Sequence, residues 1–415
     1  MRWMAGPVRF MKSLQERHGD VFTIHLLQEA PWVIVSDPAL VKQVFTASTE
    51  TLYAGQQKRI LEPVLGSSSV LLTDGEQHMR LRKLLMPMFH SSRLDDYQET
   101  MRMVAEAEIE RWPAGVAAPA ASRMNAIALE VILRTVLGLA EKEGEAPLRT
   151  SLEQLMEFLA TPRGLVALGE SSRLRDERFA EFHELLARVD KLIFAEISSR
   201  RKVDLRGRPD VLSLLLEARY EDGSLLSDRE LRDELMTLVV AGHETTATSL
   251  AWALERLVRN PEALARTVAE ARDGGGPYTE AVVRETLRIR PAFLVVPRLV
   301  RKPFQLGEYL IPPGVAVTPS IPLVHRRPDV YPDPEAFRPE RFLERQPGTY
   351  TWIPFGGGVR RCIGAGFSLL EMRIVLSTLL ARATVRMADA EPEPAIRRML
   401  VMAPSRGARL VLEPR

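Results

Sequence analysis

The chain has 415 residues, of which 46% are hydrophobic and 27% are charged, and its 56 basic and 54 acidic residues leave a formal net charge of +2. This composition excludes an intrinsically disordered chain and predicts a sizeable buried core. The nearly balanced charge gives no sign of a nucleic-acid partner.

Cysteine content and apolar runs bear on where the protein is expected to reside. Cys362 is the only cysteine, which excludes an intramolecular disulfide and is typical of a reducing compartment. Residues 1–20 lack the apolar core of a signal peptide, and no window approaches the run of about eighteen apolar residues that a spanning helix needs. We therefore expect a cytoplasmic protein with no membrane anchor. The arginine-rich, asparagine-poor composition suits a thermophilic host, but a GC-rich genome gives the same bias.

The N-terminal part of the chain predicts a small sheet followed by helices. Short β-rich runs at residues 21–27 and 32–35 flank the turn signal Glu29-Ala30-Pro31 and predict a hairpin. Asp37-Pro38 predicts a helix start, with an N-cap before a proline. Helical periodicity dominates residues 75–260. The longest helix is expected over 226–259, opened by Ser227 with Glu230 three residues later.

The C-terminal part mixes helices and short strands. The pattern predicts a helix over residues 279–290, strands at 297–300, 305–311 and 315–319, and a proline-rich irregular segment over 328–346. A helix over 365–382 and a β-hairpin near 399–412 follow. We see no internal repeat and no linker. The sequence therefore predicts a mainly α fold with a smaller β region, organised as a single domain over residues 1–415.

The cysteine lies between a glycine-rich turn and a predicted helix, in the segment from Phe355 to Gly364. Glycine backbone approaches a sulfur closely, and the following helix points its positive N-terminal end at the same atom. Both effects favour a thiolate, which is the form that binds metal. A lone cysteine is also often a buried small hydrophobe or a nucleophile beside a histidine. Neither alternative explains three consecutive glycines, an arginine two residues before the cysteine and a glycine two residues after it.

The pattern Phe355-x-x-Gly358-x-Arg360-x-Cys362-x-Gly364 resembles the haem-binding signature of the cytochrome P-450 family of haem-thiolate monooxygenases. The resemblance extends from about residue 21 to the C-terminus. It implies that Cys362 is the axial ligand of haem b (iron protoporphyrin IX), that Phe355 packs near the sulfur, that Arg360 reaches a haem propionate, and that Gly364 belongs to the cofactor site. The family's thiolate pushes electron density onto the iron so that the O–O bond cleaves.

A second motif, residues 241–246, lies inside the longest predicted helix. Gly242 in a helix interior costs roughly 1 kcal/mol relative to alanine, so it requires a reason, and a missing side chain leaves room for a ligand. An ordinary helix with threonines and a solvated glutamate is the alternative. The resemblance implies that Ala241 and Gly242 lie against the cofactor. It also implies that Glu244 and Thr245 are the acid–alcohol pair that delivers protons to dioxygen.

Two further groups of residues match the family. Glu285, Arg288 and Arg341 correspond to a buried ion network that supports the cysteine loop, although an i, i+3 pair is often only a solvated salt bridge.

The second group is basic. His78 and Arg82 are spaced i, i+4, which suits a carboxylate partner but is also typical of plain surface charge. By the resemblance they contact the haem propionates together with Arg298.

The resemblance predicts a monooxygenase that inserts one atom of dioxygen into a lipophilic substrate by hydroxylation or epoxidation. No reductase or ferredoxin domain is expected in the chain. Electrons would come from NAD(P)H through a ferredoxin or flavodoxin and its reductase. The alternatives are a peroxygenase on the same fold, a non-catalytic haem protein and a helical binding protein without a cofactor. Residues 53–72, 156–168, 238–242, 292–296 and 399–402 are expected to line the substrate pocket.

Overall fold

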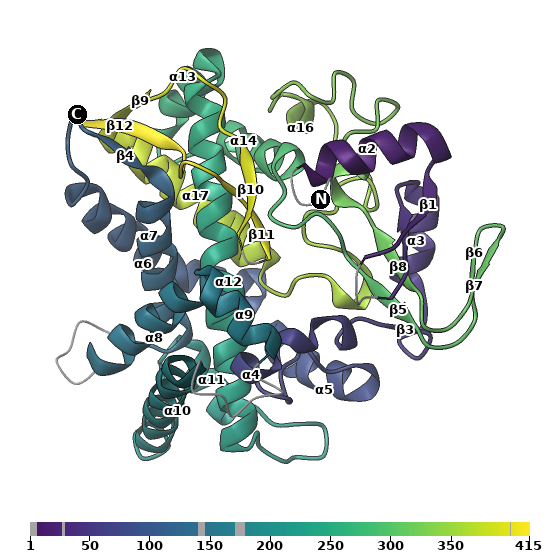
Figure 1. The fold of residues 1–415 in the computed structure, drawn as a ribbon. Helices are drawn as coiled ribbons and strands as arrows, with labels where there is room; N and C mark the ends of the chain where they lie inside the picture. Colours follow the sequence, from purple (N-terminus) through teal and green to yellow (C-terminus); the bar gives the residue numbers. More distant parts are fainter. Residues whose placement is uncertain (1–5, 27–29, 140–145, 171–178, 399) are drawn as a thin grey trace. The chain divides into compact units, whose positions relative to one another are not determined.

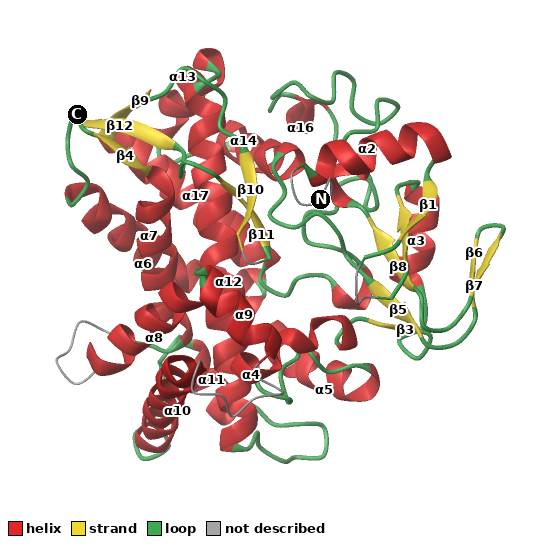
Figure 2. Ribbon diagram, in the orientation of Figure 1, coloured by secondary structure: helices red, strands yellow, loops and turns green. Residues whose placement is uncertain are grey.

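The computed structural model describes residues 6–26, 30–139, 146–170, 179–398 and 400–415 (Figure 1). The chain divides into two compact units. The mixed unit comprises Met1–Ala54, Met101–Ile127 and Thr245–Arg415, and the helical unit comprises Gly55–Thr100 and Ala128–Glu244. Within the described residues every named strand belongs to the mixed unit (Figure 2). The structure therefore confirms a mainly α fold with a smaller β region.

The helical unit is built from amphipathic helices. Helix α10 packs along α8, where the rings of Phe158 and Phe182 stack with centroids 6.0 Å apart. Three helices, α6, α7 and α12, continue into the mixed unit. The helices are η1 (Gln56–Leu61), α4 (Glu62–Leu65), α5 (Gly75–Leu85), η2 (Met86–Phe89), α6 (Ser91–Glu110), α7 (Ala120–Val136), α8 (Ala146–Leu159), α9 (Pro162–Glu170), α10 (Ala180–Arg200), α11 (Val211–Glu217) and α12 (Asp228–Val258).

The mixed unit contains a five-stranded sheet of order β1-β2-β8-β5-β3, in which only β2 and β8 are parallel. Because successive side chains of a strand point to opposite faces, Val33 and Val35 pack on α3 (Pro38–Thr46), while Ile34 packs on Met11 of α2 (Pro7–His18). The strands are β1 (Val21–Ile24), β2 (Trp32–Val35), β3 (Leu52–Tyr53), β5 (Arg298–Val300) and β8 (Ala316–Pro319).

The remaining elements of the mixed unit are helices and short strands, among them the C-terminal strands. They are β4 (Ala117–Pro119), α13 (Pro261–Ala271), α14 (Pro277–Ile289), β6 (Phe304–Leu306), β7 (Tyr309–Ile311), α15 (Ile321–Val324), α16 (Arg341–Glu344), η5 (Gly358–Arg360), α17 (Ala365–Arg382), β9 (Ala383–Met387), β10 (Ala395–Arg398), β11 (Val401–Pro404) and β12 (Arg409–Pro414). No helix among the described residues is long and apolar enough to cross a membrane.

Several local features that the sequence predicts are present in the structure. Strands β1 and β2 pair in a hairpin, although Glu29 of its turn lies outside the described residues. The Asp37 carboxylate accepts the N–H groups of Ala39 and Leu40 and caps α3. Ser227 and Glu230 form the reciprocal capping box in front of α12, with distances of 2.8 and 3.2 Å. Helix α17 has the predicted bounds. Side-chain caps and periodicity act within a few residues, which is why the sequence reveals them.

Most predicted boundaries shift by one to three residues, and three parts of the prediction need a physical explanation. Residues 305–311 form the hairpin β6–β7, because Gly307 adopts a φ of 55° and reverses the chain. Helix α14 begins two residues early, since Pro277 occupies its first turn. At the C-terminus β11 pairs with β10, and β12 pairs with β9 and β4, so no hairpin joins residues 399–412, of which Met399 lies outside the described residues. Strand β10 was not predicted, because its sequence lacks the alternation of apolar and polar residues that indicates a strand.

Candidate functional site

The cysteine loop folds against α3. Gly356 and Gly358 adopt φ values of 67° and 63°, a backbone conformation that favours glycine. A Cβ atom on Gly357 would collide with the ring of Phe45, and one on Gly358 would collide with the carbonyl oxygen of Phe45. The glycine run therefore has two roles: it allows the loop to pack closely against α3, and it allows the chain to turn.

Cys362 follows this turn directly and is exposed. Its N–H donates to the carbonyl oxygen of Phe355 at 3.0 Å, which fixes the start of the loop relative to the cysteine. Helix α17 begins three residues later, and its N-cap, Gly364, offers no side chain to the first amides. An uncapped helix N-terminus favours a negative charge nearby. The thiol is thus accessible and lies where a thiolate is stabilised.

The predicted ion network is present and fully buried. Glu285 and Arg288 of α14 have no exposed side-chain surface and form two hydrogen bonds of 2.6 and 2.8 Å. Arg341 at the start of α16 donates to the same carboxylate at 3.1 Å. Arg288 also donates to the carbonyl oxygens of Pro334 and Ala336. The three residues therefore bind α14 to the irregular segment that leads to the cysteine loop, as the sequence predicted.

His325 connects this network to the loop, and the sequence analysis did not identify it. Arg288 donates to its carbonyl oxygen at 2.9 Å, and its Nε2 accepts the N–H of Ile353 at 2.8 Å. Because Nε2 accepts, Nδ1 carries the proton and donates to the carbonyl oxygen of Arg288 at 3.1 Å. Burial lowers the pKa of His325 to about 3, so the ring is neutral. A lone histidine beside two arginines carries no sequence pattern that would reveal this role.

The other site residues of the mixed unit lie around the same loop. Phe355 meets Trp352 edge-on, with ring centroids 6.0 Å apart. Arg298 is buried in β5, and its guanidinium lies 5.8 Å from the Phe45 ring that also contacts the glycines. Arg360 is half-buried. The structure thus brings Arg298 to the cysteine loop through one shared aromatic residue.

Helix α12 contacts the helix that follows the cysteine. The hydroxyls of Thr246 and Ser368 are 3.2 Å apart, which joins α12 to the first turn of α17. The carbonyl oxygen of Thr245 accepts a hydrogen bond from Ser249 at 2.8 Å. Thr245 is one residue from the contact with α17 and is half-buried, as is Glu244. The mixed unit therefore joins the helix that carries Thr245 to the helix that begins three residues after Cys362.

The remaining candidates belong to the helical unit. His78 is buried in α5 and Arg82, one turn later, is half-buried. Ala241 is exposed. A Cβ on Gly242 would come within 2.6 Å of the end of the Ile132 side chain of α7, so this glycine admits a neighbouring helix, a reason that the sequence analysis did not consider. That His78, Arg82, Ala241 and Gly242 bind a cofactor stays a prediction.

Three polar side chains of α12 hold the loop over residues 66–73, part of the segment expected to line the substrate pocket. Asp233 accepts the N–H of Ser68 at 3.0 Å, and Glu234 accepts the N–H of Val70 at 2.7 Å. Thr237 hydrogen-bonds the Ser69 hydroxyl at 2.6 Å. Glu234 is fully buried, and burial raises its pKa to about 8. It is therefore a protonated acid at neutral pH.

Glu234→Gln is expected to stabilise the protein at alkaline pH. The folded wild type keeps a proton on Glu234 up to a pKa of about 8, whereas an unfolded glutamate releases it near the ordinary pKa, so stability falls as pH rises between these values. The slope reaches at most about 1.4 kcal/mol per pH unit. Glutamine keeps a side-chain oxygen that can accept the N–H of Val70, but it has no carboxyl proton to lose in this pH range. Urea unfolding from pH 5 to 9 measures this, with the exposed Glu184→Gln as control; equal pH profiles for Glu234→Gln and wild type would contradict it.

Comparisons with known proteins agree on one family. The family model for cytochrome P450 matches residues 3–411. Cytochrome P450 135B1 of Mycobacterium tuberculosis is 40% identical over 410 residues, covering 97% of this chain and 86% of that protein. Cytochrome P450 137 of the same organism is 39% identical over 418 residues, covering 99% and 87%.

Solved structures show the same fold. The retinoic acid-bound cyanobacterial CYP120A1 superposes with a TM-score of 0.85 at 24% identity, covering 98% of this chain and 94% of that one. The haem domain of cytochrome P450DA gives a TM-score of 0.85 at 22% identity, covering 99% and 93%. The fold predicted from the cysteine signature is confirmed. With 40% identity to one relative and a family match over nearly its whole length, the chain belongs to the cytochrome P450 family of haem monooxygenases and is an oxidoreductase.

Proposed function

We propose that this protein inserts one atom of dioxygen into a lipophilic organic substrate, by hydroxylation or epoxidation, with Cys362 as the axial thiolate of haem b. The observation that carries the proposal is the contact between α12 and α17 at Thr246 and Ser368, because it joins the acid–alcohol segment to the helix that follows the only cysteine. When bound, the haem supplies the redox chemistry that activates dioxygen.

The donor set of the mixed unit fits this cofactor. Cys362 offers an exposed sulfur beside an uncapped helix N-terminus, which suits a metal-bound thiolate. Arg298 and Arg360 are cations near the same loop, as the carboxylates of two propionates require. In our proposal His78 and Arg82 of α5 complete the propionate contacts, and the fully buried Glu285 network keeps the loop in place.

In this proposal, residues of α12 supply the protons. Reducing dioxygen to one inserted oxygen atom and one water consumes two electrons and two protons. We assign the protons to Glu244 as the acid and to the hydroxyl of Thr245 as the group that positions them. Both side chains are half-buried, so each keeps some contact with solvent, from which protons can be supplied.

The substrate is proposed to be lipophilic because the segments assigned to the pocket leave large apolar side chains uncovered. Phe293 is 37% exposed in the mixed unit, and Leu165 and Val166 are 41% and 50% exposed in the helical unit. Fatty acids, terpenoids and steroids share this chemistry. A library of such compounds, screened for substrate-induced changes in the haem absorption spectrum, tests the assignment. A response confined to small polar compounds would contradict it.

Electrons are proposed to come from NAD(P)H through a separate ferredoxin or flavodoxin and its reductase. Arg361, beside the ligand, is exposed and marks the docking surface. We do not assign the basic residues Arg80 and Lys83 of α5 to this surface. Each already forms an ion pair, with Asp222 at 2.9 Å and Glu221 at 2.6 Å, so neither adds an uncompensated charge.

Arg361→Glu is expected to slow electron transfer from an acidic ferredoxin about tenfold at low ionic strength, because electrostatic steering of that partner is lost. The difference from wild type should shrink as salt is raised, since salt screens exposed charges. Stopped-flow reduction measures both. The control is Arg206→Glu, at an exposed arginine that forms an ion pair with Asp204. If the rate of electron transfer depends neither on Arg361 nor on ionic strength, the docking surface lies elsewhere.

A further inference from the structure

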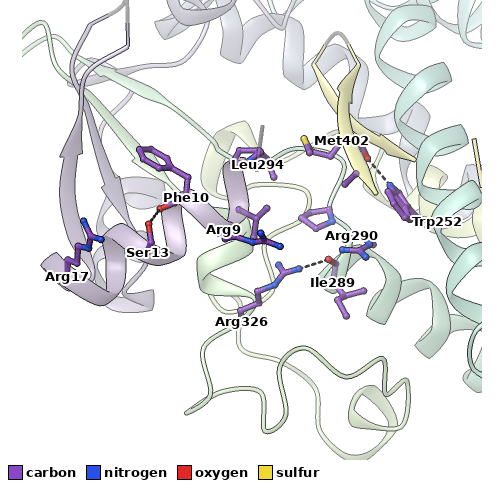
Figure 3. Close-up of a pocket in the computed structure, with 15 residues that line it drawn as sticks. Arg9, Phe10, Ser13, Arg17, Trp252, Ile289, Arg290, Leu294, Arg326 and Met402 are labelled. Atoms are coloured by element: carbon purple, nitrogen blue, oxygen red, sulfur yellow. Dashed lines mark hydrogen bonds between the residues drawn. The ribbon is translucent and has the colours of Figure 1, made fainter. Parts of the chain in front are cut away.

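The mixed unit contains a cavity beside the first turn of α2. Its volume is about 580 Å³, and it lies between the start of α2, the end of α14 and strand β11 (Figure 3). Small-molecule sites have volumes of roughly 300–1,000 Å³, so this cavity is large enough to hold a ligand. None of the residues assigned above to the haem or to proton delivery lines it.

The cavity is strongly basic. Arg9, Arg17, Arg290 and Arg326 line it, and no acidic side chain among the described residues does. Arg9 comes from α2, Arg290 from the end of α14 and Arg326 from the segment after α15, and Figure 3 shows these three side chains pointing toward one another. Three cations from separate segments converge on one space, which is an unfavourable arrangement unless an anion occupies it.

Existing contacts leave much of this charge uncompensated. The Nε of Arg290 is buried with no hydrogen-bond partner, and its guanidinium lies 4.8 Å from the Trp252 ring centroid. The nearby Glu255 already binds Arg256 and Arg259. Burial lowers the pKa of Arg290 to about 10, so it remains charged at neutral pH.

The other two arginines of this group, Arg9 and Arg326, differ in their contacts. Arg326 is held in place by Glu335 at 3.3 Å and by the carbonyl oxygen of Ile289 at 2.8 Å. Arg9 is exposed and forms no ion pair with a residue that the structure describes. A bound anion would therefore find one fixed donor and two donors still available.

Apart from Ser13, whose hydroxyl donates to the carbonyl oxygen of Phe10 at 2.8 Å, the rest of the lining is apolar and supplies a surface for a hydrocarbon chain. Phe10, Trp252, Leu294 and Met402 stand around the arginines, and the indole N–H of Trp252 is already donated to the carbonyl oxygen of Met402 at 2.8 Å. Few unsatisfied polar groups remain besides the guanidinium groups. Such a wall does not suit a sugar or a nucleotide, whose hydroxyls need partners.

We propose that this cavity binds a long-chain carboxylate, whose head group is held by Arg9 and Arg290 and whose alkyl chain lies against Trp252 and Leu294. A guanidinium matches a carboxylate with two parallel hydrogen bonds, and Arg290 offers a buried N–H that lacks an acceptor. The site contains no residue assigned to the haem, but it shares Leu294 and Met402 with segments expected to line the substrate pocket, so its test includes competition with a haem ligand.

Calorimetric titration of the haem-loaded protein with dodecanoate, below its micelle concentration and without vesicles, tests the proposal. One site per chain is expected. Dodecanol lacks the charge and acetate lacks the chain, so each should bind at least tenfold more weakly. Arg290→Gln and Arg9→Gln should each weaken dodecanoate binding about tenfold or more. Because Arg9 is exposed, its variant should fold even if the Arg290 variant does not. Arg206→Gln is the surface control.

Four results would overturn the proposal. Dodecanol binding as tightly as dodecanoate would show that the arginines do not recognise the charge. Unchanged affinity in Arg9→Gln together with a folded Arg290→Gln would place the ligand elsewhere. Loss of dodecanoate binding in the presence of saturating imidazole, which ligates haem iron, would assign the ligand to the haem pocket. Binding of the protein only to anionic vesicles, and not to free dodecanoate, would likewise contradict a small-molecule site.

Discussion

Glu285→Ala and Arg288→Ala are each expected to lower the free energy of unfolding by about 3–5 kcal/mol and to yield little haem-loaded protein. Both side chains have no exposed surface, so removing one leaves the other charge buried without its partner. In Glu285→Ala, Arg341 would also lose the carboxylate that accepts its Nε–H. The effect should reach the cysteine loop through His325, whose carbonyl oxygen binds Arg288 and whose ring binds Ile353.

Helix α14 supplies a matched control. Glu280 and Arg284 also form an ion pair within one helix turn, at 2.6 Å, but the Glu280 side chain is 48% exposed. Glu280→Ala should therefore cost less than about 1 kcal/mol, as exposed pairs do. Urea unfolding and the ratio of haem to protein absorbance are the measurements. A Glu285→Ala protein that folds and loads haem as well as Glu280→Ala would disprove the scaffold role.

Thr245→Ala is expected to uncouple reductant consumption from product formation. The variant should fold, because alanine is the better helix former, and the Ser249 hydroxyl keeps its acceptor on the backbone of residue 245. Without the hydroxyl, protons are no longer positioned, so reduced oxygen leaves as peroxide. We expect product per nicotinamide oxidised to fall severalfold, with peroxide rising in its place. Thr245→Ser, which retains a hydroxyl, should largely restore coupling.

Glu244→Ala should act on rate more than on coupling. A positioned acid contributes about 10²–10⁴-fold, so turnover should fall by about that much while haem loading is unchanged. An unchanged product-to-nicotinamide ratio in Thr245→Ala would move the proton path elsewhere. A wild-type protein that works only when fed peroxide, with competent redox partners present, would favour the peroxygenase alternative.

The part of this fold that could be predicted from sequence is the part set by short-range physics. The caps at Asp37 and Ser227 and the bounds of α17 depend on neighbours within a few residues. The cysteine motif was informative because several residue types had to coincide. Strand pairing was harder, since the partner of β12 is β9, more than twenty residues earlier, and β10 has no alternating pattern.

The site residues that sequence reasoning missed act through long-range packing. His325 binds residues 28 and 37 positions away, and no local pattern marks it. Gly242 signals an unusual helix position, but only the structure shows Ile132 in the space it leaves. Glu234 reads as an ordinary solvated charge in a helix, whereas it is buried and bound to the loop at Val70. Burial is a property of the fold, so the charged residue type alone does not reveal whether the side chain is buried.

The absorption spectrum of the reduced, carbon monoxide-bound protein tests the central assignment most directly. Wild type should show the band typical of thiolate ligation, and Arg361→Ala, one residue away and exposed, should keep it. Cys362→Ala should lose that band completely, because the chain has no second cysteine to replace the ligand. A thiolate-type spectrum that survives in Cys362→Ala would contradict the assignment of this cysteine, and with it the proposed function.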